Sequence, residues 1–198
     1  MISKKGAIWL SVIVSQGLFV ALIPIWIKLF TYLHQVVMLV VWFGLTIFIF
    51  YLVFLITKNT ITIPRSVLTI TLLIYTCCLL VLIFFRPSDQ EYQTYNLVPF
   101  KTISFYFSGK VSFLIAFYNL AANVLLFIPY GIYATISAKK KRKSKLKRIA
   151  APIIAIAFIE ILQFITKTGS LDIDDLILNV FGVYLGYGLP GITRIIRY

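Results

Sequence analysis

The sequence contains few of the residues from which most catalytic and metal-binding sites are built. Among its 198 residues are six acidic residues, two cysteines and one histidine. His34 stands alone, which excludes a metal site with several histidine ligands. Cys77 and Cys78 are adjacent in an apolar run, where neighbouring helical positions point about 100° apart, so packing explains them better than a disulfide. No Ser/His/Asp set or phosphate-cradling glycine loop is present, so any catalysis must use carboxylates, amides, tyrosines or basic residues.

The chain is rich instead in apolar residues. Hydrophobic residues make up 61% of it and charged residues 13%, and its mean hydropathy is +0.97. A soluble domain of this length does not need so much apolar surface. The composition therefore predicts an all-α fold, a polytopic bundle of transmembrane helices.

Six apolar runs are long enough to be transmembrane helices. The first follows Lys4 and Lys5 and lacks the cleavage site of a signal peptide, so we interpret it as an uncleaved span. Residues 86–110 form the longest polar interval, an outward loop that either lies at the membrane interface or re-enters the bilayer. The six runs cover about residues 8–30, 36–56, 67–85, 111–137, 149–165 and 176–192.

The basic residues indicate how the chain is oriented. Its formal charge is +13, and many of its 19 basic residues lie in one tract, residues 139–148, between two apolar runs. This placement is typical of the positive-inside rule, so we reject nucleic acid as a partner. With six spans and this tract inside, both termini are cytoplasmic, and residues 86–110 and 166–175 face outward. We expect a multi-pass protein of the bacterial cytoplasmic membrane.

Four of the six acidic residues fall within residues 160–175. Glu160 and Gln163 lie one turn apart on one predicted helix, and Asp175 and Asn179 lie one turn apart on the next. Because a charged side chain that faces lipid is costly, we expect the acids and amides to converge on one cavity in the outer half of the membrane. The expected lining residues are Asn119, Asn123, Glu160, Gln163, Asp175 and Asn179.

Each of these groups has a structural and a functional interpretation. For Glu160 we favour proton transfer over a simple hydrogen bond to Gln163 or to an asparagine, because a carboxylate inside a membrane is a functional candidate by default. For the three aspartates within residues 172–175 we favour helix capping over the binding of Mg²⁺ or Ca²⁺. The two asparagines of the fourth run fit interhelical hydrogen bonding and ligand binding equally well.

Four segments, in this order and spacing, resemble the VanZ family. They are Asn96-Leu-Val-Pro-Phe100, Asn119-x-x-x-Asn123-Val-Leu-Leu-Phe-Ile-Pro129-x-Gly131, Glu160-x-x-Gln163 and Asp172-Ile-Asp174-Asp175-Leu-Ile-Leu-Asn179-x-x-Gly182-x-x-x-Gly186. The resemblance covers about residues 67–190. It implies a two-span extension, residues 1–66, followed by a VanZ-like membrane domain, residues 67–198.

The VanZ family is named for a membrane protein that accompanies glycopeptide-resistance genes and gives low-level teicoplanin resistance. Many relatives carry an arginine shortly after the Glu-x-x-Gln element, whereas this chain has Ser170 there. If that arginine binds an anion in the relatives, the anion-binding role is either missing from this chain or passes to another basic residue. The candidates are Lys167, Arg86 and Lys101.

Residues and resemblance together predict a VanZ-like envelope protein, linked to glycopeptide resistance, that binds an amphiphile in an outward-facing polar pocket, with or without modifying it chemically. The expected partner is a membrane lipid, a lipid-linked glycan or phosphate precursor, or a lipoglycopeptide such as teicoplanin, and the sequence identifies no cofactor and no metal site. The alternatives are a non-enzymatic binder or transporter and a scaffold for envelope enzymes. The predicted catalytic residues are Glu160, Asp172 and Asp175. The predicted ligand-binding residues are Asn96, Asn119, Asn123, Gln163, Lys167, Asp174 and Asn179.

Overall fold

Apolar helices form most of the structure, a computed structural model that describes residues 2–30, 36–84, 95–138 and 145–197. The all-α, membrane-type fold expected from the composition is confirmed. Within these residues, four helical stretches are long and apolar enough to cross a membrane. They are Met38–Thr57, Arg65–Phe84, Phe113–Ser137 and Leu146–Ile165.

The chain divides into two compact units, which we describe one after the other. The first contains Met1–Leu82 together with Pro190–Tyr198, and the second contains Ile83–Leu189. The helices of the first unit are α1 (Lys4–Ala21), α2 (Ile23–Phe30), α3 (Val36–Thr57), most of α4 (Arg65–Phe84) and the short α10 (Ile192–Ile195).

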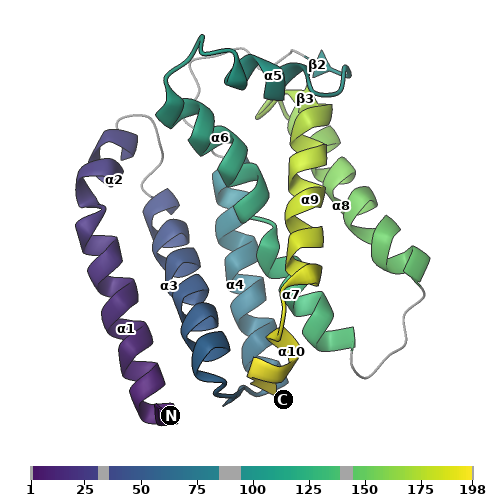
Figure 1. The fold of residues 1–198 in the computed structure, drawn as a ribbon. Helices are drawn as coiled ribbons and strands as arrows, with labels where there is room; N and C mark the ends of the chain where they lie inside the picture. Colours follow the sequence, from purple (N-terminus) through teal and green to yellow (C-terminus); the bar gives the residue numbers. More distant parts are fainter. Residues whose placement is uncertain (1, 31–35, 85–94, 139–144, 198) are drawn as a thin grey trace. The chain divides into compact units, whose positions relative to one another are not determined.

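Small side chains bring α1 against α3 in the first unit (Figure 1). Ala7, Ser11 and Ser15 lie one turn apart on α1 and are fully buried. Small residues at this spacing allow two helix backbones to approach closely. Trp42 of α3 adds a polar contact, because its indole Nε1–H donates a hydrogen bond of 2.8 Å to Oε1 of Gln16.

The carboxyl-terminal end of the chain returns to the first unit. A short strand β1 (Ile61–Thr62) pairs in parallel with β4 (Ile196–Arg197). The Tyr51 hydroxyl donates a hydrogen bond of 2.9 Å to the Pro190 carbonyl, just before α10. The final residues therefore fold with the first helices rather than with the helix that precedes them in the sequence.

A proline divides the first predicted span. α1 ends at Ala21, Leu22 is its C-cap, and α2 begins at Ile23 with Pro24 in its first turn. Proline has no N–H to donate to the preceding turn and its ring clashes with the carbonyl four residues earlier, so a helix ends before it. The predicted run of residues 8–30 is therefore two helices.

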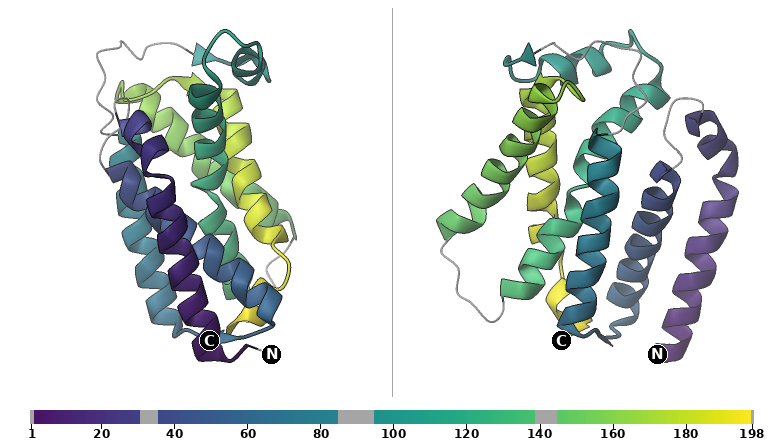
Figure 2. Two further views of the ribbon diagram at one scale, coloured as in Figure 1. Left: turned by 60° about the vertical axis from the view of Figure 1, so that its left-hand side comes forward. Right: turned by 180° about the vertical axis from the view of Figure 1, so that it is seen from behind.

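The second unit is built around its last helix. It contains β2 (Tyr95–Asn96), α5 (Lys101–Phe107), α6 (Phe113–Leu125), α7 (Ile128–Ser137), α8 (Lys145–Ile165), β3 (Leu171–Asp172) and α9 (Ile173–Gly188). α9 packs against α6 and α7 on one side and against α8 on another (Figures 1 and 2). Its 16 residues give a length of about 24 Å, less than the roughly 30 Å of a bilayer core.

Glycines set the distance between α9 and the α6–α7 pair. A Cβ added at Gly182 would lie 2.1 Å from the Val124 carbonyl oxygen, and one at Gly186 would lie 2.3 Å from the Ile128 carbonyl oxygen. Across the contact, a Cβ at Gly131 would lie 2.1 Å from the Val183 carbonyl oxygen. No side chain fits at these distances, so the Gly-x-x-x-Gly sequence on α9 is a packing surface.

The structure leaves two sequence predictions wholly or partly untested. Residues 86–94, the first part of the predicted outward loop, lie outside the described residues, and the rest of that loop contains β2 and α5. A domain boundary at residue 67 stays a prediction, since the compact units separate after residue 82.

Candidate functional site

The aspartates at the start of α9 cap that helix, as their spacing predicts. Asp172 is the N-cap residue, with extended backbone angles of −119° and 120°. Its Oδ1 accepts a hydrogen bond of 2.9 Å from the Asp174 backbone N–H. Asp174 and Asp175 lie in the first helical turn, where the helix dipole favours negative charge.

Asp174 also caps a second helix, α5. Its side chain is fully buried and accepts hydrogen bonds from three backbone N–H groups at 2.5, 2.7 and 3.1 Å. The donors are Phe100, Thr102 and Ile103. Phe100 is the N-cap of α5, and its own side chain makes no capping hydrogen bond. Asp174 therefore supplies from a distant part of the chain the acceptor that this helix end requires.

Asp172 fastens the same region through side chains. Its Oδ1 accepts a hydrogen bond of 3.0 Å from Asn96 Nδ2, and its Oδ2 accepts one of 2.6 Å from the Thr102 hydroxyl. The backbone adds a parallel pairing of β2 with β3, in which Asn96 lies opposite Asp172. We call Asn96, Thr102, Asp172 and Asp174 the aspartate clamp. Hydrogen bonds from within the protein replace the water that both carboxylates lose when they are buried.

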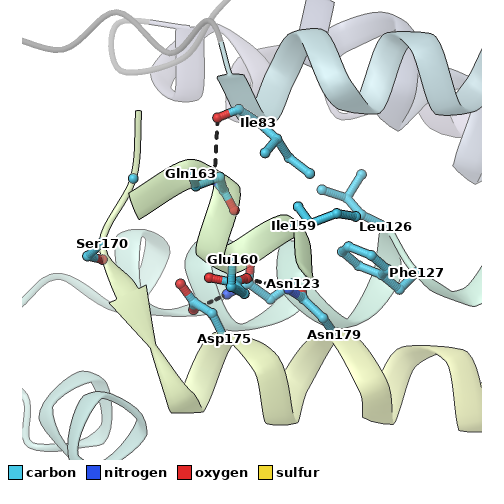
Figure 3. A pocket seen from close by; sticks show the side chains of 11 residues that line it. Ile83, Asn123, Leu126, Phe127, Ile159, Glu160, Gln163, Ser170, Asp175 and Asn179 are labelled. Atoms are coloured by element: carbon cyan, nitrogen blue, oxygen red, sulfur yellow. Dashed lines mark hydrogen bonds between the residues drawn. The ribbon is translucent and has the colours of Figure 1, made fainter. Parts of the chain in front are cut away.

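A polar cavity lies beside the clamp, where α6, α8 and α9 meet. Its volume is about 60 Å³, with room for only a few water molecules. Figure 3 shows acidic and amide side chains gathered around it, with apolar side chains along one side. The lining residues are Ile83, Asn123, Leu126, Phe127, Ile159, Glu160, Gln163, Gly169, Ser170, Asp175 and Asn179.

Amide groups orient the carboxylates of the cavity. Asn179 Nδ2 donates a hydrogen bond of 3.1 Å to Glu160 Oε1, and Asn123 Nδ2 donates one to Asp175 Oδ1. Gln163 Nε2 donates to the Ile83 carbonyl at 3.4 Å. Each pair joins residues from different helices, so the cavity is held by interhelical contacts.

One acceptor in the cavity is left over. Asn179 is only 5% exposed, and its Oδ1 has no hydrogen-bond partner among the described residues. Leaving a buried acceptor unsatisfied costs about 1–3 kcal/mol. A ligand or a water molecule that donates a hydrogen bond to this oxygen would remove the cost.

The structure divides the predicted site residues into three groups. Glu160, Gln163, Asp175, Asn179 and Asn123 line the cavity together, as expected. Asn96, Asp172 and Asp174 form the clamp instead, and none of them lines the cavity. The third group, Asn119 and Lys167, lies outside both.

Asn119 and Lys167 have local surroundings that separate them from the cavity. Asn119 Nδ2 donates a hydrogen bond of 2.8 Å to the Ile115 carbonyl on its own helix. It lies about 6 Å along α6 from Asn123, because four helical residues rise by that distance. Lys167 is exposed and adopts left-handed backbone geometry, with φ of 58°, just after α8. Of the other basic candidates, Lys101 is exposed, and Arg86 lies outside the described residues.

Two polar residues of this region were not among the predicted site residues. Thr102 bridges Asn96 and Asp172 in the clamp, and Ser170 lines the cavity. Ser170 carried a signal in the sequence, since it occupies the position where VanZ relatives often carry arginine. Thr102 carried none. Within the described residues, no three histidine, cysteine or acidic side chains are grouped so that they could hold a metal ion.

Comparison with known proteins identifies the family. The family model described as VanZ/LLP1 matches residues 71–194, which include the clamp and the cavity. The chain therefore belongs to the VanZ/LLP1 family, and the resemblance noted in the sequence is confirmed. It is similar to "Protein VanZ" of Enterococcus faecium, with 33% identity over 78 residues. That match covers 39% of this chain and 47% of the relative, so it spans about half of the relative's length. No solved structure matches the chain significantly.

Proposed function

Taking membership of the VanZ/LLP1 family as the starting point, we propose that this protein binds the polar part of a membrane amphiphile in the cavity beside Glu160. The observation that supports the proposal is the gathering of Glu160, Asp175 and Asn179 around one cavity between helices of a membrane-type fold. Acidic and amide groups at such positions are costly, and proteins keep them where they serve a pathway or a binding site.

The size of the cavity limits what enters it. A volume of about 60 Å³ admits one small polar group and a water molecule, but not a whole sugar or peptide. We therefore propose that only the terminal group of the amphiphile reaches Glu160, and that its apolar part stays among the lipids. A lipid-linked envelope precursor and a lipoglycopeptide such as teicoplanin both meet this requirement.

The charge pattern supports a location of the cavity in the outer half of the bacterial cytoplasmic membrane. The basic tract of residues 139–148 runs into the first turn of α8 and, by the positive-inside rule, faces the cytoplasm. Glu160 lies about 22 Å along α8 from Lys145, by the rise of 1.5 Å per residue. That distance carries Glu160 past the bilayer centre. An amphiphile of the outer leaflet is the ligand that fits this placement.

Binding is favoured over catalysis by the composition of the cavity. Among its described lining residues there is no histidine or cysteine, and Glu160 is engaged with the Asn179 amide. In this arrangement Glu160 orients the ligand and accepts its proton or hydrogen bond. Catalysis with Glu160 as acid or base is the second candidate, because a buried carboxylate next to a small cavity can transfer a proton to a bound group.

Mass spectrometry of co-purified lipids tests the binding proposal. We expect wild-type protein to retain one lipid class above its abundance in the membrane, and the Glu160→Gln variant to lose that enrichment. The control is Ile161→Ala, because Ile161 is the next residue on α8 and is 46% exposed. Equal lipid profiles in all three proteins would contradict the proposal. Chemical alteration of the retained lipid by wild-type protein alone would favour the catalytic candidate.

A further inference from the structure

We infer that residues 95–113 form a lipid-binding surface, which lies in the headgroup layer of a phospholipid bilayer at the interface opposite the basic tract. We call these residues the interfacial surface. The inference goes beyond the proposed function, because it concerns a part of the protein outside the cavity and needs no ligand there. It is carried by the position of the segment relative to two spans, by its exposed side chains and by their charge.

The two spans of the second unit place the interfacial surface about one membrane thickness from the basic tract. α8 has 21 residues and a length of about 31 Å, close to the roughly 30 Å of a bilayer core. The tract runs into its first turn, and β3, which pairs with β2, lies shortly after its last turn. The span Phe113–Ser137 begins where the interfacial surface ends, and the tract follows it. Both spans therefore join the tract to the level of the interfacial surface.

The contacts of α5 place it at the end of these helices and not between them. Its first turn donates hydrogen bonds to Asp174, which itself lies in the first turn of α9. Figures 1 and 2 show α5 at the end of this unit where α6 and α9 begin. A segment that re-enters the bilayer would lie beside the middle of these helices, where protein or water must cover its backbone. The observed contacts therefore favour the interface over re-entry.

The interfacial surface exposes several large apolar side chains. In α5, Ile103 and Tyr106 lie one turn apart and are partly buried, whereas Phe105 and Phe107 are exposed. The exposed fraction is 78% for Phe107 and 82% for Phe113. Exposed rings and aliphatic side chains at the end of a span are typical of segments that lie in the headgroup region of a membrane. The other exposed apolar members are Leu97, Val98 and Phe100.

The charge of the interfacial surface matches lipid phosphates. It contains two exposed lysines, Lys101 and Lys110, and no acidic residue. The clamp carboxylates that contact it are buried and accept hydrogen bonds within the clamp. The whole interval of residues 86–110 also keeps a positive balance, with three basic and two acidic residues. Because a lysine at a membrane interface places its ammonium group near the phosphates and its apolar stem among the lipids, phospholipid headgroups are the partner that fits.

Depth measurements on single-cysteine variants test the inference. The full-length protein carries Cys77→Ala and Cys78→Ala, so that the cysteine introduced by Phe107→Cys is the one that bimane labels. The protein is reconstituted in vesicles of phosphatidylcholine and phosphatidylglycerol that carry a nitroxide either at the headgroup or near the end of the acyl chain. We expect the label to lie about 5–10 Å below the phosphates, where the headgroup nitroxide quenches it more strongly than the chain-end nitroxide does.

Two exposed positions on α8 calibrate the depth scale. Ile165→Cys labels the end of this helix, and Ile154→Cys labels a position about 16 Å deeper, because eleven residues separate the two. We expect the depth of Phe107→Cys to match that of Ile165→Cys. A depth equal to that of Ile154→Cys would show a re-entrant segment, and a label reached only by a water-soluble quencher would show a surface for a partner in solution. Either result would overturn the inference.

Two further variants test the lysines and separate the inference from the proposed function. We expect the label of Lys110→Cys to lie at the level of the phosphates, above that of Phe107→Cys, and the reverse order would overturn the inference. Glu160→Gln combined with Phe107→Cys should leave the depth of the label unchanged, and a changed depth would contradict a surface that needs no cavity ligand. If Glu160→Gln retained the same lipids as wild-type protein, the proposed function would fail, whereas an interfacial depth of Phe107→Cys would still support this inference.

Discussion

In the aspartate clamp, Asp174 accepts hydrogen bonds from three backbone N–H groups, whereas in the adjoining cavity Asn179 Oδ1 accepts none from the described residues. Each region takes two of its polar residues from the start of α9, Asp172 and Asp174 in the clamp and Asp175 and Asn179 in the cavity. The clamp joins α5 to α9 and supplies carboxylate acceptors to backbone N–H groups at the start of both helices. In the cavity, by contrast, hydrogen bonds join the surrounding helices, but Asn179 Oδ1 has no partner among the described residues.

The difference teaches how to tell structural acids from functional ones in an apolar protein. A buried carboxylate with several backbone donors stabilises the fold and has little capacity left for a ligand. A buried polar group that lacks a partner reduces stability, and folded proteins keep such groups where they bind something. By this criterion Asp172 and Asp174 belong to the scaffold, and Asn179 marks the proposed binding site.

Removal of the clamp's central carboxylate is the strongest way to test this division. We expect Asp174→Ala to lower the free energy of unfolding by roughly 3–5 kcal/mol, because it leaves three backbone donors without their charged acceptor. Reversible unfolding in mixed detergent micelles measures the loss. The control is Ser108→Ala, at the exposed C-cap of α5. A loss below about 1 kcal/mol would mean that the clamp is not structural.

Replacement of a glycine on α9 tests the scaffold independently of its acids. We expect Gly182→Ala to lower the free energy of unfolding by about 2–3 kcal/mol, because its Cβ would lie 2.1 Å from the Val124 carbonyl oxygen. Gly188→Ala, at the end of the same helix, is the matched control because its Cβ would meet nothing within 4 Å. Thermal unfolding of both variants provides the comparison, and similar midpoints would contradict the close packing.

A pair of isosteric changes compares the two regions directly. We expect Asp174→Asn to lower the free energy of unfolding by about 1–2 kcal/mol, because an amide has one acceptor oxygen for three backbone donors. We expect Glu160→Gln to change it by less than about 1 kcal/mol, because the new amide oxygen can still accept from Asn179 Nδ2.

Lipid retention should respond in the opposite order in this pair. Glu160→Gln loses the enriched lipid while the fold stays stable, and Asp174→Asn keeps it below its own unfolding temperature. Both properties are measured on the same preparations, by thermal unfolding and by mass spectrometry of bound lipid. If the stability losses of the two variants were equal, the distinction between clamp and cavity would fail.

Much of the fold and part of the site could be predicted from the sequence. Long apolar runs identify α3, α4 and α8, because their hydrophobicity needs no partner to be recognised. The helical spacing of Glu160 with Gln163, and of Asp175 with Asn179, places each pair on one helix face. An aspartate directly before a helix predicts a cap, which Asp172 provides.

The remaining features depend on contacts between distant segments. Asp174 bonds to residues more than seventy positions earlier in the chain, and no local pattern states which helix end an aspartate will cap. Asn119 and Asn123 share a helix face, yet only the second lies at the depth of the cavity. Depth along a helix follows from the sequence, but the position at which a neighbouring helix leaves space does not.

The smallest expected effect concerns Lys167, a predicted ligand-binding residue outside both regions. Its backbone φ of 58° is left-handed, a geometry that costs a residue with a Cβ about 1 kcal/mol relative to glycine. We expect Lys167→Gly to raise the free energy of unfolding by up to that amount and to leave lipid retention unchanged, as measured by thermal unfolding and mass spectrometry.

Lys167→Ala separates the two roles that this residue could have. Alanine removes the charge and keeps the Cβ, so the stability gain should be absent with alanine and present with glycine. Loss of the enriched lipid in both variants would assign a ligand-binding role to the lysine charge, and would extend the binding site beyond the cavity. Retention in both would confine the site to the residues around Glu160 and Asn179, where the unsatisfied acceptor lies.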